Sequence, residues 1–184
     1  MAAERSLLDL YHDLDKEALI QQVFKLAESD QTIPVSDLVS ILEDALDIEL
    51  VALIIETFLR RIDDVADQLI MHYSATSDVV KRHIIQILCQ SLNSKRMQFL
   101  LSEYFENPYM RPLIRRGCFQ EKTFLFMNLV RFYEDVPHTF DNVTVAQQIL
   151  KTIPRSVVLK AGMVFSGTRL MDVYLAIPPE DRQK

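Results

Sequence analysis

The sequence contains very little glycine, and this shortage limits the folds and sites that it can form. Three glycines occur in 184 residues. Glycine supplies the positive φ angles of tight hairpins and lets a backbone approach a phosphate closely. Tryptophan is absent, and so are a Walker loop, a Rossmann fingerprint and a Gly-x-Ser-x-Gly elbow. The sequence therefore argues against a β-rich fold and against a glycine-rich nucleotide site.

Cysteine and long apolar runs are scarce as well. The two cysteines, Cys89 and Cys118, form no Cys-x-x-Cys motif, and this usage fits a reducing compartment. The first residues lack the basic and then apolar pattern of a signal peptide. The longest apolar stretch, 48–59, is interrupted by Glu49 and Glu56 and is shorter than the roughly 20 residues that a spanning helix needs. We expect a soluble cytoplasmic protein without a membrane segment.

Catalytic and metal-binding patterns are missing too. The four histidines show no metal-ligand spacing of the His-Glu-x-x-His kind. The densest group of acids, Asp63, Asp64 and Asp67, fits the first turn of a helix, where carboxylates stabilise the helix dipole. We therefore expect no metal, no cofactor and no catalytic residue, and the protein is predicted to be non-enzymatic.

Helical periodicity runs along nearly the whole sequence. Apolar residues recur three or four positions apart, and prolines or short polar runs separate the segments. Because the turns are short, neighbouring helices should be antiparallel. The predicted fold class is all-α, with stacked antiparallel helix pairs that form an α-solenoid or a compact bundle. We expect one helical domain at 1–177 and a polar C-terminal tail at 178–184.

Three segments carry more specific expectations. In the helix expected from Asp15, Phe24 belongs to the predicted buried stripe. The helix after Asp47 should turn six side chains inward: Ile48, Val51, Ala52, Ile55, Phe58 and Leu59. Residues 157–165 form either a helix or a short strand, because three large aliphatic residues stand in a row at 157–159.

Three consecutive units begin near Pro34, Asp63 and Ser94, about 30 residues apart, and each reads as a helix, a polar turn and a second helix. The second helix of the unit at 63–92 reads Asp78-Val79-Val80-Lys81-Arg82-His83-Ile84. It resembles the HEAT repeat, in which a capping Asp precedes Val-Arg and a small or apolar residue. The resemblance is best over 34–134. It implies an α-solenoid that acts as a protein–protein scaffold, and some members of the family bind nucleic acid backbones.

Charge and aromatic residues are unevenly distributed. Residues 1–50 hold twelve Asp and Glu against three Lys and Arg, whereas residues 81–131 hold nine Lys and Arg against three Glu. Residues 99–140 contain ten of the sixteen aromatic residues. Arginine offers a planar fork for carboxylate or phosphate and stacks on rings, so this region is a candidate partner surface. The candidate residues are Tyr109, Arg111, Arg115, Arg116 and Arg131. The alternative is that these charges are neutralised within the fold and that the aromatic residues belong to the core.

Two functions follow from these patterns. The first is an interaction or scaffold module whose partner is a protein, through an acidic or amphipathic segment. The alternative is a nucleic-acid-binding helical-repeat protein, including a DNA base-excision enzyme on the same scaffold. Its phosphate contacts would come from Lys81, Arg82, Lys95, Arg96, Arg115 and Arg116. The net charge of −6 disfavours this alternative, because phosphate contacts dominate such binding.

Overall fold

The computed structural model describes residues 6–183, without the side chains of residues 162 and 163. The chain is 74% helical, and no strand occurs among the described residues. The predicted all-α fold class is confirmed. Residues 1–5 of the predicted domain and Lys184 of the predicted tail lie outside the described residues.

The chain divides into two compact units, Met1–Ser91 and Leu92–Lys184. The single domain predicted at 1–177 stays a prediction. Each unit has its own buried apolar residues, including Leu38, Ile54 and Ile84 in the first and Leu100, Ile114 and Leu129 in the second. These six side chains are fully buried, so each unit is described by itself below.

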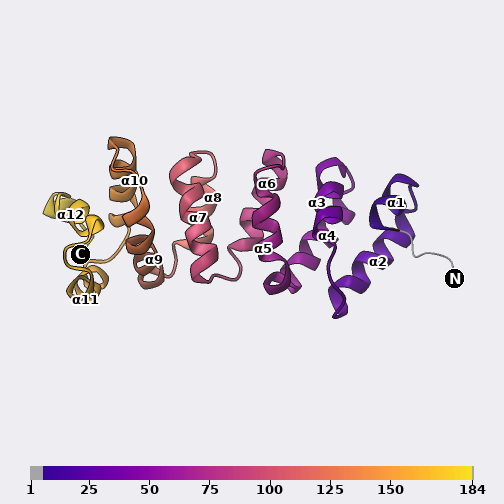
Figure 1. The fold of residues 1–184 in the computed structure, drawn as a ribbon, viewed down its shortest axis with the longest axis horizontal. Helices are drawn as coiled ribbons and strands as arrows, with labels where there is room; N and C mark the ends of the chain where they lie inside the picture. Colours follow the sequence, from indigo (N-terminus) through magenta and orange to yellow (C-terminus); the bar gives the residue numbers. More distant parts are fainter. Residues whose placement is uncertain (1–5, 184) are drawn as a thin grey trace. The chain divides into compact units, whose positions relative to one another are not determined.

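The first unit consists of two layers of three helices. Its helices are α1 (Leu7–His12), α2 (Lys16–Glu28), α3 (Val35–Asp44), α4 (Ile48–Arg60), α5 (Ile62–Tyr73) and α6 (Asp78–Leu88). Helices α1, α3 and α5 contact one another in sequence, and so do α2, α4 and α6. Each pair of consecutive helices joins the two layers, and Figure 1 shows the three pairs side by side in chain order. Every helix thus buries its apolar stripe against neighbours that are close in sequence.

Two helices of the first unit, α2 and α4, begin at the acidic residues from which the sequence predicts them. The side chain of Asp15 caps α2 by accepting the N–H of Ala18, and Asp47 caps α4 by accepting those of Glu49 and Leu50. Such caps satisfy the N–H groups that the first turn of a helix leaves without an intrahelical partner.

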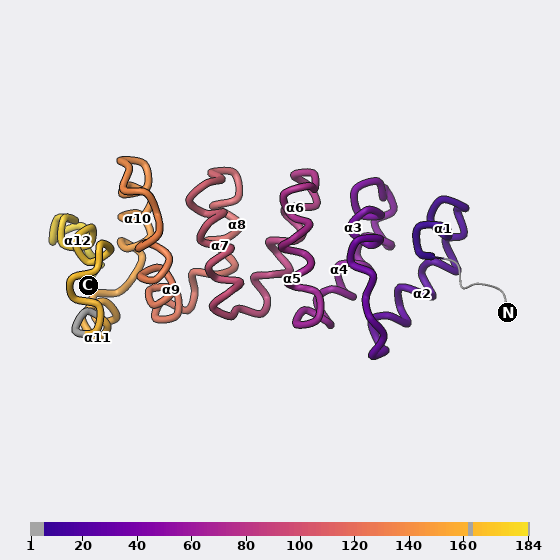
Figure 2. Tube along the Cα trace, in the orientation of Figure 1, coloured from indigo at the N-terminus to yellow at the C-terminus, as the bar shows by residue number. Residues whose placement is uncertain are grey.

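The second unit is built around α7 and α9. Its helices are α7 (Ser94–Glu106), α8 (Arg111–Cys118), α9 (Lys122–Asp135), α10 (Phe140–Leu150), α11 (Arg155–Phe165) and α12 (Arg169–Leu175), followed by a short 3₁₀ turn at Pro179–Asp181. Helix α7 packs on α8 and α9, while α12 packs on α9 and α10, and Figure 2 traces this path. Residues 157–165 are helical, which settles the alternative left open by the sequence.

The C-terminal segment predicted as a polar tail is tied to the second unit. The guanidinium of Arg182 donates to the carbonyl oxygens of Leu175 and Ile177 and lies 5.0 Å from the centre of the Tyr174 ring. The ammonium of Lys151 lies 2.9 Å from the carboxylate of Asp181. The described part of the tail therefore contributes to the packing of the C-terminal helices.

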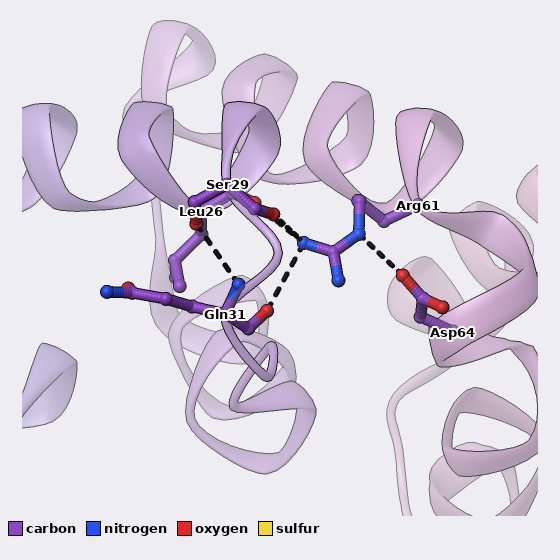
Figure 3. A network of polar contacts seen from close by, with 5 residues as sticks. All are labelled: Leu26, Ser29, Gln31, Arg61 and Asp64. Carbon is purple, nitrogen blue, oxygen red and sulfur yellow. Dashed lines mark hydrogen bonds and ion pairs between the residues drawn. The ribbon is translucent and has the colours of Figure 1, made fainter.

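Arginines that bind carbonyl oxygens at helix ends recur in both units. Arg61, at the start of α5, donates to the carbonyls of Leu26, Ser29 and Gln31 at the end of α2 and to the carboxylate of Asp64, as Figure 3 shows. Arg169, at the start of α12, donates to the carbonyls of two residues at the end of α9, Glu134 and Val136. In both units the arginine neutralises the negative end of a helix that lies about 30 residues earlier.

Candidate interaction surface

Tyr104 accepts hydrogen bonds from two of the candidate arginines, Arg111 and Arg115. It lies on α7, is fully buried, and packs its ring against Phe119, with 4.9 Å between ring centres. Its carbonyl oxygen accepts a hydrogen bond of 2.7 Å from Nε of Arg111, and its hydroxyl accepts one of 2.7 Å from Arg115. One buried residue therefore fixes two arginines of α8.

Arg111 and Arg115 nevertheless differ in whether their guanidinium groups can bind a ligand. Arg111 is half-buried, also donates to the carbonyl of Phe105, and lies 5.8 Å from the centre of the Tyr104 ring. It satisfies the last carbonyls of α7, so its main role is structural. Arg115 is exposed, and its hydrogen bond to a neutral hydroxyl leaves its charge uncompensated. Arg115 can therefore reach a ligand, while Arg111 holds the helix that carries it.

Arg115 has two positively charged neighbours in sequence or space. Arg116 follows it and is exposed, and Lys122 stands half-buried at the start of α9. Burial lowers the pKa of Lys122 below its ordinary value, and the nearby charge of Arg115 lowers it further. We name these three residues the α8 basic cluster.

Within the part of the chain that the structure describes, no carboxylate forms an ion pair with the α8 basic cluster. Among the described residues, Arg115, Arg116 and Lys122 form no ion pair with Asp or Glu, and neither do Arg111 and Arg131. By contrast, Lys16, Arg60 and Lys151 each lie within 4 Å of a carboxylate. The positive charges at α8 are consequently open to an anionic group from outside.

The structure brings together some of the predicted partner-binding residues and separates others. Tyr109 precedes α8 and is 84% exposed. Arg131 is exposed on α9, nine residues after Lys122. Nine residues make two and a half helical turns, so the two side chains leave α9 on opposite sides. Arg131 therefore lies apart from the α8 basic cluster.

The phosphate contacts required by the nucleic acid alternative are not all accessible. Arg96 is 5% exposed and belongs to the core of the second unit, so it cannot reach a phosphate. Lys81 places its ammonium 5.6 Å from the centre of the Tyr73 ring. Arg82 and Lys95 are exposed. The burial of Arg96 could not be predicted from the sequence, because an arginine in a helix is usually a surface residue.

A second surface was missed because its residues were expected in the core. The buried face of α4 consists of Leu50, Ile54, Thr57 and Phe58. Of the residues predicted to face inward, only Phe58 is fully buried, while Ile48 is 85% exposed and Ala52 and Leu59 are exposed. On α2, Phe24 is 47% exposed. The available signal was that α4 is apolar on nearly every face, more than one buried stripe requires.

Neither a metal-binding group nor a membrane span stands out in the part of the chain that the structure describes. Within residues 6–183, no three His, Cys, Asp or Glu side chains are grouped to hold a metal ion. None of the described helices combines the length and the apolar character needed to cross a membrane. Comparisons with models of known protein families, with curated proteins and with solved structures found no match.

Proposed function

We propose that the protein is a non-enzymatic interaction module whose α8 basic cluster binds an acidic segment of a protein partner. The observation that carries this proposal is the absence of any carboxylate partner for Arg115, Arg116 and Lys122 among the described residues. An uncompensated cluster of this kind attracts an anionic segment and orients it. Tyr109 adds an exposed ring of the type enriched at binding hot spots.

We also propose that the fold is a HEAT-like α-solenoid. The hydrogen bonds that join different helix pairs connect residues 30 to 35 positions apart, as in Arg61 to Gln31, Ser77 to Glu43 and Arg169 to Glu134. A narrow range of spacings is expected when one structural unit repeats and contacts only its neighbours. The burial of both cysteines is compatible with a cytoplasmic protein.

Charge reversal at the cluster tests the proposed function. The variant Arg115→Glu/Arg116→Glu is compared with Arg155→Glu/Lys160→Glu, which makes the same charge change at exposed positions of α11 in the same unit. The probe is a fluorescent peptide rich in Glu with interspersed Leu. We expect the α8 variant to bind it more than about tenfold more weakly than the wild type, and the α11 variant to bind normally.

Thermal unfolding of the same variants separates binding from structure. Both arginines are exposed, and the one hydrogen bond that is lost, from Arg115 to the hydroxyl of Tyr104, should cost about 1 kcal/mol, so the melting temperature of the α8 variant should lie only a few degrees below that of the α11 variant. A loss of more than about ten degrees in the α8 variant alone would show that these arginines are mainly structural. If the wild type prefers mixed-sequence duplex DNA to the acidic peptide, with a steep salt dependence, the nucleic acid alternative would replace the proposal.

A further inference from the structure

The groove between α2 and α4 is apolar along its middle and charged at its ends. It has a volume of about 380 Å³ and is lined by Ile20, Gln21, Phe24, Lys25, Glu49 and Leu53. At one end, the ammonium of Lys16 lies 2.6 Å from Asp47 and 3.3 Å from Glu49. At the other, Arg60 lies 3.8 Å from Glu28. Because the N-terminal ends of α2 and α4 pair with each other, and so do their C-terminal ends, the two helices run parallel on either side of the groove.

Three large aliphatic side chains are exposed in the two segments that meet at the first end of this groove. Leu14 is 86% exposed and lies two residues before Lys16, while Leu46 and Ile48 flank Asp47. Leu46 is 97% exposed. The ion pair between Lys16 and Asp47 joins the two segments that carry these exposed side chains. Soluble proteins rarely expose several such residues together unless the surface binds something.

The conformation of Leu14 adds an independent observation. Its φ angle is 58°, and it is the one non-glycine residue with a positive φ in the described part of the chain. A leucine is strained in this region, which Asn, Asp or Gly occupy more easily. The side chain of Leu14 is thus not packed against the free protein, and leucine is a poor choice for the positive φ angle at this position.

Charge around the aliphatic side chains restricts what can cover them. Residues 13–17 and 44–49 hold six carboxylates, Asp13, Asp15, Glu17, Asp44, Asp47 and Glu49, against the single cation Lys16. The whole first unit holds 17 Asp and Glu against 7 Lys and Arg, a net charge of −10. Such a surface repels anionic lipid and repels the same face of a second copy. It attracts an apolar surface that is flanked by Lys and Arg.

We propose that the α2–α4 groove and the neighbouring Leu14, Leu46 and Ile48 bind a basic amphipathic helix of a protein partner. Two apolar side chains of that helix, spaced i and i+4, enter beside Phe24 and Leu53. Lysines or arginines next to them meet the carboxylates at the start of α2 and α4. Between Lys16 and Glu28, helix α2 rises about 18 Å alongside α4, the length of roughly three turns of a docked helix. This proposal does not depend on the α8 basic cluster, which lies in the other unit.

A synthetic helix tests the proposal directly. The probe is a fluorescent peptide of about 15 residues made of Leu, Ala and Lys, with leucines at i, i+4 and i+7. A second peptide of the same composition has its leucines distributed around the helix. Anisotropy with the full chain should show binding of the amphipathic peptide at least about tenfold tighter than that of the redistributed one.

Matched variants place the binding on the surface. Phe24→Ser/Ile48→Ser should bind the amphipathic peptide at least about tenfold more weakly. Met71→Ser/Val79→Ser makes the same change on α5 and α6, where these residues are 78% and 63% exposed, and should bind as the wild type does. Circular dichroism should give equal helix content for all three proteins, because every substituted side chain is at least partly in solvent.

Four outcomes would overturn the proposal. One is equal binding of both peptides, which indicates charge attraction alone, and another is unchanged binding by the Phe24→Ser/Ile48→Ser variant. The third is sedimentation showing a dimer that this variant alone abolishes, which makes a second copy the occupant. The fourth is binding to phosphatidylcholine vesicles that the same variant abolishes, which makes lipid the occupant.

Discussion

The arginines of this protein differ in what their guanidinium groups touch, and the difference determines their roles. Arg61 donates to three backbone carbonyls and to Asp64, and its side chain is 18% exposed. Arg115 and Arg116 face solvent and have no carboxylate partner among the described residues. A guanidinium that satisfies helix-end carbonyls contributes to stability, whereas one in solvent is available for a ligand.

Arg61→Ala should therefore destabilise the protein. It leaves the carbonyls at the end of α2 without their charged donor, and hydrogen bonds to charged groups contribute about 1.5–3 kcal/mol. Urea unfolding followed by circular dichroism measures the loss. Arg60→Ala is the control, because Arg60 pairs only with exposed carboxylates and should cost less than about 1 kcal/mol. Equal effects of the two substitutions would contradict the capping role.

Ile84 provides a second test at the residue scale. Its side chain is fully buried on α6. Ile84→Ala removes buried methyl groups and leaves a cavity, so it should cost about 2–5 kcal/mol in the free energy of unfolding. Val79→Ala, at an exposed position of the same helix, should change stability by no more than about 0.5 kcal/mol. An unchanged urea midpoint for Ile84→Ala would mean that another face of α6 is packed.

At the scale of the helix, α4 shows what periodicity can and cannot predict. Its start follows from the Asp47 cap, which the sequence identifies, and the structure confirms that start. Its buried face could not be predicted, because Ile48, Leu50 and Ile55 are equally apolar and belong to different stripes. The choice depends on α2, α3, α5 and α6, which pack against α4 and lie elsewhere in the sequence.

The candidate site shows the same limit. Clustering of arginine and aromatic residues indicated α8, and Arg115 and Arg116 are indeed exposed. Composition could not show that Arg111 would bind the carbonyls of α7, since that contact depends on how α8 folds back on α7.

The ion pair at the starts of α2 and α4 should make stability depend on pH. Lys16, by its hydrogen bond, and the N–H of Leu50 hold the pKa of Asp47 below its ordinary value of 3.8. A carboxylate with a lowered pKa in the folded state stabilises the fold above 3.8, and this contribution is lost as the pH falls through the lowered pKa. Asp47→Asn keeps a capping side chain and removes the charge.

Unfolding free energies of the wild type and Asp47→Asn measure that effect. The wild type should be more stable at pH 7, and the difference should shrink as the pH falls below 3.8. A difference that stays constant down to the lowest pH at which the protein folds would show that the charge of Asp47 contributes nothing.

The start of α9 should respond to pH in the opposite direction. Burial, and then the charge of Arg115, lower the pKa of Lys122 from 10.5. Below the lowered pKa the folded state holds a charge that its surroundings disfavour, and stability rises as the pH increases toward 10.5. Lys122→Met should thus be more stable than the wild type at pH 7, and the gap should close at higher pH. In Arg115→Met, an NMR titration should find the Lys122 pKa raised; an unchanged pKa would show that the two charges do not interact.

For the whole molecule, charge is separated between the two units. The first has a net charge of −10, and the second holds 13 Lys and Arg against 9 Asp and Glu, a net charge of +4. The overall value of −6 hides this division. Each unit therefore carries a field of its own sign, and each of the two proposed surfaces matches the sign of its unit.

Leu14 has a consequence for how the free protein balances stability against recognition. The backbone of Leu14 is strained and its side chain lies in solvent. The substitution Leu14→Asn should therefore raise the unfolding free energy by about 1 kcal/mol and weaken the binding of the basic amphipathic peptide. Leu46→Asn, at a position without positive φ, should weaken binding of the peptide without raising the unfolding free energy. If both variants were more stable than the wild type, backbone strain at Leu14 would not be the cause. The free protein is then less stable than the same fold with an unstrained residue at position 14. Contacts between the Leu14 side chain and a bound partner offset that loss of stability.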